Sequence, residues 1–310
     1  MTSGLRTFAT WALFPILVSA LAAWAVIGST WDITTRLGLP GRVGPSLLIF
    51  GTILVAYPLL ALLERLMPYR PEWNRAHGDT RADALHLLVT GPGTSSLHEA
   101  LVHGTFAAAG VWLAGRLGGW LWPATWPAPA QLGLALLVSE FGHYWFHRVA
   151  HEQALVWRLH ATHHSALRLY WMNATRFHPL DLLGLMSCQS APLFLLGAPE
   201  RTLLMYALFS VVYGQLQHCN VALRTPRVVD WVFSTPGVHR WHHSTEVHEG
   251  NNNYGAIFSL WDHVFGSFFR PRDPFAKAVG IADMPTFPRD YVGQVLAPFR
   301  WARIGRITDP

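Results

Sequence analysis

The chain has 310 residues, of which 51% are hydrophobic and only 13% are charged. That charged share is about half of the share in a typical soluble domain, which excludes a mostly water-facing surface. The formal net charge is +5, but the arginines that carry it are scattered among apolar runs. The chain therefore lacks the dense basic block that is typical of a nucleic-acid-binding protein. Its charge favours contact with an anionic membrane surface.

Two apolar stretches near the N-terminus predict membrane-spanning helices. Residues 11–27 and 47–63 carry no charged side chain, and each approaches the ~20 residues that cross a ~30 Å hydrocarbon core. A second span directly after the first favours a retained anchor over a cleaved signal peptide. Four arginines follow between residues 65 and 81, so the positive-inside tendency places this segment and the N-terminus in the cytoplasm.

Three further apolar segments follow in chain order. Residues 97–117 and 130–146 predict an out-and-back helical pair, joined by a turn rich in Trp and Pro at 120–129. Residues 182–217 are interrupted at 197–201 by Gly-Ala-Pro-Glu-Arg, which predicts a short hairpin that dips into the membrane and returns. Every histidine cluster then lies on one side, which the topology makes the cytoplasmic side.

These segments predict an all-α fold, an integral membrane helical bundle with a histidine-rich cap for two metals on the cytoplasmic side. We expect N-terminal transmembrane helices over residues 1–128, a catalytic domain over 129–270 and a C-terminal cytoplasmic tail over 271–310. Arginine dominates the basic residues and Lys277 is the only lysine. This balance favours a bacterial inner membrane over an endoplasmic reticulum.

Seventeen histidines are present, and most of them fall in tight clusters. His143, His147 and His151 are spaced four residues apart, so on a helix their imidazoles share one face. The runs 160–164 and 239–243 both read His-x-x-His-His. At those offsets one imidazole can bind one metal while its neighbours bind another.

This number of histidines exceeds what a single zinc site uses, which predicts a pair of metal ions. Neutral imidazole suits iron, zinc, copper and nickel, so the ligand type alone does not name the metal. The Glu and Glu-x-x-His pattern of familiar di-iron bundles is absent. Isolated histidines such as His77, His86 and His263 are interpreted as ordinary core or surface residues.

The order of the clusters resembles the signature of the fatty acid hydroxylase and sterol desaturase superfamily, which is His-x3-4-His followed by two copies of His-x2-3-His-His. Supporting similarity extends over residues 140–269 and includes His178-Pro179, Asn253-Tyr254-Gly255 and 261–266. The resemblance implies a membrane enzyme that uses two Fe ions and O2 to oxidise a lipid-like or sterol-like hydrophobic substrate. Zinc is a conceivable substitute for iron in purified protein.

The resemblance also implies the metal ligands, with His218 as a ninth ligand, and no catalytic residue beyond them: His143, His147, His160, His163, His164, His218, His239, His242 and His243. Metal-bound imidazoles usually donate their other N–H to a carboxylate or a carbonyl. Five carboxylates are candidates for that orienting role: Glu140, Glu152, Asp181, Asp230 and Asp262. His151 and His178 could each be a further ligand, a hydrogen-bond partner of a ligand or a structural residue.

Several functional readings stay open. Hydroxylation is favoured over desaturation, because the family's desaturases more often have four residues between the first two histidines. A zinc-dependent membrane hydrolase is the main alternative, although the chain lacks its His-Glu-x-x-His motif. A metal or haem carrier would be expected to place polar groups along a pathway through the membrane, and not only at helix ends.

The electrons that reduce O2 must come from a separate donor protein. The chain has no dinucleotide-binding loop and no cysteine set for an iron–sulfur cluster. The expected partners are therefore the membrane, a hydrophobic substrate and that electron donor.

Overall fold

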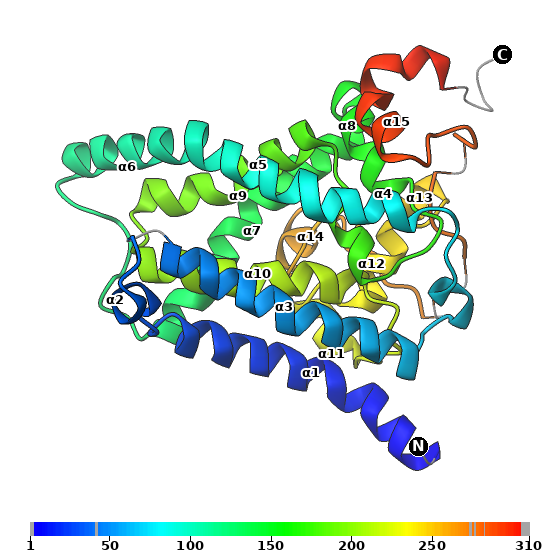
Figure 1. Cartoon of the computed structure of the whole chain (residues 1–310), viewed down its shortest axis with the longest axis horizontal. Coiled ribbons are helices and arrows are strands. Elements are labelled where there is room, and N and C mark those ends of the chain that lie inside the picture. The colour runs from blue at the N-terminus through cyan, green and yellow to red at the C-terminus, as the bar shows by residue number, and fades with distance from the viewer. Residues whose placement is uncertain (1–2, 41–42, 273–274, 276, 282, 305–310) are drawn as a thin grey trace.

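Long apolar runs in the sequence become long helices, which lie side by side along the longest axis of the molecule (Figure 1). The computed structural model describes residues 3–40, 43–272, 275, 277–281 and 283–304. Within these residues the regular structure is helical, and β pairing is limited to isolated bridges. The all-α prediction is confirmed.

The first two predicted spans are both helical. α1 (Ser3–Gly28) and α3 (Val43–Leu66) pack against α10 (Glu200–His218), which lies between them and the rest of the bundle. In the described part of the chain, α1, α3 and α9 (Pro179–Leu196) are the helices long and apolar enough to cross a membrane. Outward side chains such as Val55, which is 71% exposed, suit contact with lipid.

The helical segment that the sequence predicts at residues 97–117 begins earlier in the structure. α4 (Thr80–Leu85), α5 (Gly91–His98) and α6 (Gly104–Leu117) follow one another along a single helical path, whereas the hydropathy pattern placed the start at residue 97. π-helical turns at 86–90 and 99–103 join α4, α5 and α6, so the backbone changes its hydrogen-bond pattern there without ending the helix. Polar side chains in this stretch, such as His86, are buried against other elements and so do not mark a helix boundary.

α7 (Ala128–Glu152) continues past its predicted end at residue 146, which keeps His147 and His151 on one helical face. α9 and α10 form the predicted hairpin. It turns at Gly197, whose φ of 82° lies in the left-handed region. A Cβ atom at this position would lie 2.1 Å from the ring of Trp120, so both conformation and space require glycine.

Short helices form a cap at the end of the bundle where α7 and α10 finish (Figure 1). They are α8 (Ala154–His164), α12 (Pro236–His242), α13 (Val247–Gly250) and α15 (Tyr291–Leu296). α11 (Arg227–Val232) and α14 (Leu260–Val264) lie beside the long helices, and Trp261 of α14 contacts Phe141 in the middle of α7. The chain after residue 270 packs onto this cap, since Met284 and Phe287 cluster with Ala161 of α8.

Residues 273–274, 276, 282 and 305–310 of the predicted tail lie outside the described residues. The division of the chain at residues 128 and 270 stays a prediction.

Candidate metal centre

Two groups of histidines meet at the base of the cap. Within each group, one ring nitrogen or other ligand atom per residue lies within 4.8 Å of all the others. The first histidine group contains His147, His151, His160, His164 and His242. The second histidine group contains His163, His218, His239 and His243.

The repeated His-x-x-His-His pattern divides between the two groups. On α8, His160 and His164 join the first group while His163 joins the second. On α12 the division is reversed, because residues 239 and 243 join the second group and residue 242 joins the first. Side chains four residues apart share a helical face and the intervening one is turned aside. Each short helix therefore contributes to both groups.

Several ring nitrogens of these groups are buried without a hydrogen-bond partner, including Nε2 of His147, His160 and His242. The opposite nitrogen of each of these rings is anchored. Nδ1 of His147 lies 2.8 Å from the Tyr254 carbonyl, and Nδ1 of His242 lies 2.8 Å from the Asn252 carbonyl. Such bonds place the proton on Nδ1 and leave the Nε2 lone pair facing the centre of the group, which is the tautomer that binds a metal.

Ring nitrogens of the second group also lie close to one another. Nε2 of His239 lies 2.9 Å from Nε2 of His218 and 3.0 Å from Nε2 of His243. Ligand nitrogens around a metal at ~2.0–2.1 Å lie at roughly this separation from one another. Facing lone pairs repel unless a proton or a cation lies between them, so the geometry fits a bound metal ion.

Burial keeps these imidazoles uncharged. The pKa of His163, His239 and His243 is held well below the ordinary histidine value, mainly because burial disfavours the charged ring. Burial has the same effect on the pKa of His164 and His242 in the first group. Neutral imidazole is the form that ligates metal, so both groups are ready to bind without releasing protons.

Two predicted carboxylates hold the loop that orients His147. Glu140 accepts hydrogen bonds from the backbone N–H groups of Ala256 and Ile257. Asp262 accepts from the backbone N–H groups of Tyr254 (2.8 Å) and Gly255 (2.9 Å). Both carboxylates therefore fix the segment whose Tyr254 carbonyl anchors the histidine. The sequence predicted a direct bond from carboxylate to ring, whereas for these two carboxylates the structure places the backbone of residues 254–257 between the carboxylate and the ring.

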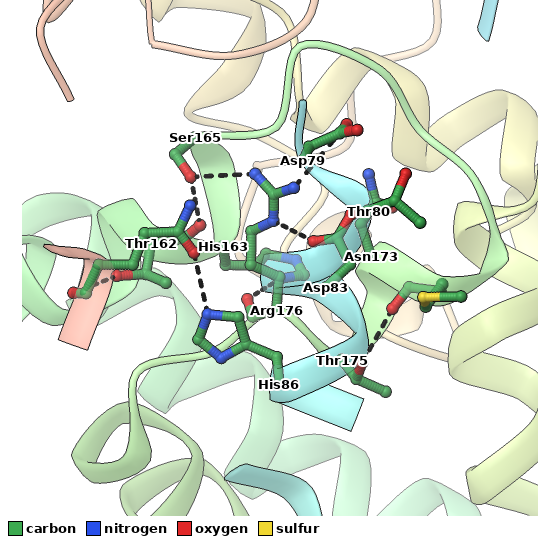
Figure 2. A network of polar contacts seen from close by, with 12 residues as sticks. Asp79, Thr80, Asp83, His86, Thr162, His163, Ser165, Asn173, Thr175 and Arg176 are labelled. Carbon is green, nitrogen blue, oxygen red and sulfur yellow. Dashed lines mark hydrogen bonds and ion pairs between the residues drawn. The ribbon is translucent and has the colours of Figure 1, made fainter. Parts of the chain in front are cut away.

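A buried ion network supports the second group (Figure 2). The Arg176 carbonyl accepts from Nδ1 of His163 at 3.2 Å. The guanidinium of the same arginine donates to Asp83 of α4 at 2.5 Å and approaches Asp79 at 4.0 Å. Asn173 in the same loop contacts Nδ1 of His218 through its side-chain oxygen at 3.2 Å. The segment that joins α8 to α9 is thereby held between α4 and the second histidine group.

The structure brings together eight of the nine ligands that the sequence suggested and places the remaining one, His143, in neither group. His143 lies one turn before His147 on α7, and its Nδ1 contacts Gln189 at 2.8 Å. His151, an uncertain residue in the sequence, lies in the first group instead. His178 caps the N-terminus of α9 and contacts the Val295 carbonyl, so its contacts are structural.

Asp181, one of the carboxylates that the sequence offered as an orienting group, contacts Nδ1 of His160 directly at 2.9 Å. Other residues that anchor the ligands escaped the pattern of the sequence. The carbonyls of Asn252, Tyr254 and Arg176 give no signal at all, because every residue has a carbonyl. Their role follows only from the folded path of the backbone.

A cavity of about 150 Å³ adjoins both groups on the side of the long helices. Histidines of both groups line it, together with apolar side chains such as Phe177, Leu185 and Ile257. Phe177 stacks on His163 with ring centroids 4.2 Å apart. A second hollow of about 290 Å³ opens to the surface and reaches His151, His164 and His242 of the first group.

Comparisons with known proteins agree with this geometry. Residues 132–267 match the model of the fatty acid hydroxylase family. The chain is 37% identical to the ornithine lipid hydroxylase OlsE of Rhizobium tropici, over 94% of this chain and 89% of that protein. It is 32% identical to human alkylglycerol monooxygenase, over 46% of this chain and 32% of that protein. No solved structure matched the chain.

A third relative is the Delta(7)-sterol 5(6)-desaturase erg3B of Aspergillus fumigatus, which is 31% identical over 47% of this chain and 42% of that protein. Fold and site define a helical membrane protein with a polyhistidine centre that could hold two metal ions. The chain belongs to the fatty acid hydroxylase and sterol desaturase superfamily, and it is an enzyme of the lipid hydroxylase or desaturase type. The resemblance noted in the sequence is confirmed.

Proposed function

We propose that this enzyme is a di-iron, O2-dependent hydroxylase of a polar membrane lipid, with an ornithine lipid as the first substrate to test. The observation that carries the proposal is the pair of buried, neutral histidine groups beside a cavity. The extended similarity to an ornithine lipid hydroxylase, over nearly the whole chain, supports the substrate class.

We assign the nine residues of the two groups as ligands of two iron ions, five in the first group and four in the second. In this assignment His151 takes the place that the sequence gave to His143. The donor set fits iron, since uncharged imidazole suits Fe(II) and leaves an iron pair more positive than a carboxylate shell would. When bound, the iron pair supplies the redox chemistry that reduces O2 and inserts one oxygen atom into a C–H bond.

The residues of the chain prepare that chemistry. The carbonyls of Asn252 and Tyr254 and the carboxylate of Asp181 hold ring protons on Nδ1, so each ligand presents its lone pair in a fixed direction. Phe177, Leu185 and Ile257 keep the cavity largely apolar, which excludes water from the reacting carbon. The cavity lies on the side of the long helices, so a lipid would reach it from the membrane.

We place the enzyme in a bacterial inner membrane with the metal centre on the cytoplasmic side. The arginines between residues 65 and 81 lie at the same end of the bundle as the cap, and the positive-inside tendency assigns that end to the cytoplasm. A cytoplasmic electron donor would then approach the surface hollow that reaches the first group. Glu140 is the carboxylate that lines the cavity beside the two groups, and its oxygens already accept hydrogen bonds from two backbone N–H groups, which disfavours it as the general base of a zinc hydrolase.

The test is oxygen incorporation. Purified enzyme in lipid nanodiscs is supplied with iron, a chemical or enzymatic reductant, an ornithine lipid and ¹⁸O2, and the lipid is analysed by mass spectrometry. We expect one ¹⁸O atom per product molecule. The His242→Ala variant should give no product, whereas the His77→Ala variant should match the wild type, because the His77 side chain is exposed and belongs to neither histidine group. Release of an acyl group or headgroup without ¹⁸O would contradict the proposal.

A further inference from the structure

The cavity beside the metal groups is not uniformly apolar. His143 of α7, Gln189 of α9, and Tyr206 and Ser210 of α10 line it in addition to the metal-group histidines. These side chains belong to three helices of the bundle, where a polar group without a function is costly. We name this set, formed by His143, Gln189, Tyr206 and Ser210, the polar pocket.

His143 is oriented as a hydrogen-bond donor toward the cavity and not as a metal ligand. Gln189 Nε2 donates to His143 Nδ1 at 2.8 Å, so Nδ1 carries the lone pair. In a neutral imidazole the proton then resides on Nε2. This assignment depends on the orientation of the Gln189 amide, which a variant can test. It also agrees with the absence of His143 from both described groups.

The contact between these two residues is enforced by the backbone. Gly142, directly before His143, lies against Cys188, directly before Gln189. A Cβ atom on Gly142 would lie 1.8 Å from the Cys188 carbonyl oxygen, so any other residue would push α7 and α9 apart. The glycine therefore brings the two helices into contact at the level of the polar pocket.

The α10 side of the polar pocket has hydrogen-bonding capacity to spare. Ser139 Oγ donates to Tyr206 Oη at 2.7 Å, which leaves the tyrosine proton free to donate elsewhere. Ser210, one turn further along α10, has a buried Oγ whose polar neighbour is the Tyr206 hydroxyl, although the two form no hydrogen bond of ordinary geometry. A ligand oxygen in the cavity could therefore accept a better hydrogen bond from this pair of hydroxyl groups than they make with each other.

The charges around the cavity define the class of ligand. No arginine or lysine is among its described lining residues, so an anionic headgroup would lack a counterion. Glu140 also lines the cavity, but its carboxylate is already bonded to two backbone N–H groups. The donors that remain suit an uncharged oxygen such as a carbonyl, hydroxyl or ether oxygen.

We propose that the polar pocket binds an uncharged oxygen group of the lipid and thereby fixes which carbon, a few bonds away, faces the metal centre. The inference rests on the proposed lipid hydroxylase function and deepens it. The enzyme accordingly selects substrates by a polar group held close to the oxidised carbon. A plain hydrocarbon of equal chain length is not a substrate.

The test compares wild type with Gln189→Leu, which is similar in volume and cannot hydrogen-bond, and with Gln189→Glu. A carboxylate at position 189 accepts the proton of Nδ1 and so converts Nε2 from a donor to an acceptor. Ser190→Ala is the matched control, because Ser190 is the next residue on α9 and bonds to His98 outside the cavity. KM, kcat, the position of the new hydroxyl group and iron per chain are measured with an ornithine lipid and with hexadecane.

We expect both Gln189 variants to raise KM for the lipid about tenfold, as the loss of roughly one hydrogen bond predicts. We also expect them to spread the hydroxyl group over neighbouring carbons, with iron content unchanged and Ser190→Ala like the wild type. Unchanged KM and hydroxyl position in both variants would overturn the inference, as would equal turnover of hexadecane by the wild type.

A second variant separates substrate binding from metal binding. His143→Gln should retain two irons per chain and show the same raised KM, whereas loss of an iron would make His143 a ligand and overturn the inference while leaving the proposed function intact. Failure of the proposed function itself is distinguishable, because the iron-loaded wild type would then oxidise no lipid at all.

Discussion

The two histidine groups differ in what surrounds them. All members of the second group are buried, and an ion network of Arg176 with Asp79 and Asp83 backs the loop that anchors two of them. The first group includes the half-buried His151 and borders a surface hollow. Its anchors are mainly the carbonyls of a loop.

This difference suggests unequal roles for the two metals. A site that is rigid and enclosed holds its metal tightly, whereas a site that reaches the surface exchanges more readily with solvent and lies nearer to a docked partner. Four experiments can break or sharpen the comparison.

The largest effect is expected from removing a ligand. His239→Ala and His242→Ala lie one turn apart on α12 but belong to different groups, so each should lose the metal of its own group. Either loss should lower lipid oxidation by more than ~100-fold, since both metals are needed. Metal analysis with a product assay checks this, and full activity in either variant would remove that residue from the ligand set.

The next largest effect is expected from residues that hydrogen-bond to the ligands or to the loop that carries their partners. Asp83→Asn weakens the ion pair with Arg176, and Asp181→Asn weakens the contact with Nδ1 of His160. Each should lower the affinity for one metal about 10- to 100-fold, the former in the second group and the latter in the first. Competition with a graded series of chelators measures the affinities. If both variants weakened the same metal, the division into two separately supported groups would be wrong.

Chelation of the wild type should show a smaller difference. A water-soluble Fe(II) chelator can approach the first group through the surface hollow, whereas no described member of the second group lines that hollow. We expect iron to leave in two phases whose rates differ several-fold. The absorbance of the chelate follows the time course, and a single phase for both irons would contradict the comparison.

The smallest effect is expected at the start of α12, which carries His239 and His242 and is followed directly by His243. Thr235 caps this helix by accepting a hydrogen bond from the Val238 N–H, and it also donates to Asp230 at 2.7 Å. Thr235→Ala should lower the free energy of unfolding by about 1 kcal/mol, while Thr235→Ser retains the hydroxyl and most of the stability. Thermal melting in detergent compares the two, and equal melting temperatures would exclude a capping role.

Much of the fold could be predicted because membrane helices leave a strong signal. Apolar runs near the length of a bilayer located α1, α3, α7 and the hairpin of α9 with α10. The start of the helical path through α4, α5 and α6 was missed, since its polar side chains are buried by other elements and its π-helical turns give no hydropathy signal.

The histidine clusters were also visible, because offsets of three and four are meaningful once a helix is assumed. The sequence did not show whether His143 or His151 belongs with the other clustered histidines. Both are four residues from His147 and both lie on its face of α7, so only the packing of α8 and α9 against that face decides which one meets the other histidines. The polar pocket escaped notice for the same reason, as Gln189 and Ser210 are ordinary residues of apolar helices until the folded chain places them at the cavity.

The most direct test of the central claim is the metal content of anaerobically purified enzyme, combined with Mössbauer spectroscopy after growth on enriched iron. The account predicts about two irons per chain in a magnetically coupled pair, with two distinguishable environments. A single metal ion per chain, or zinc that iron reconstitution does not replace, would contradict it.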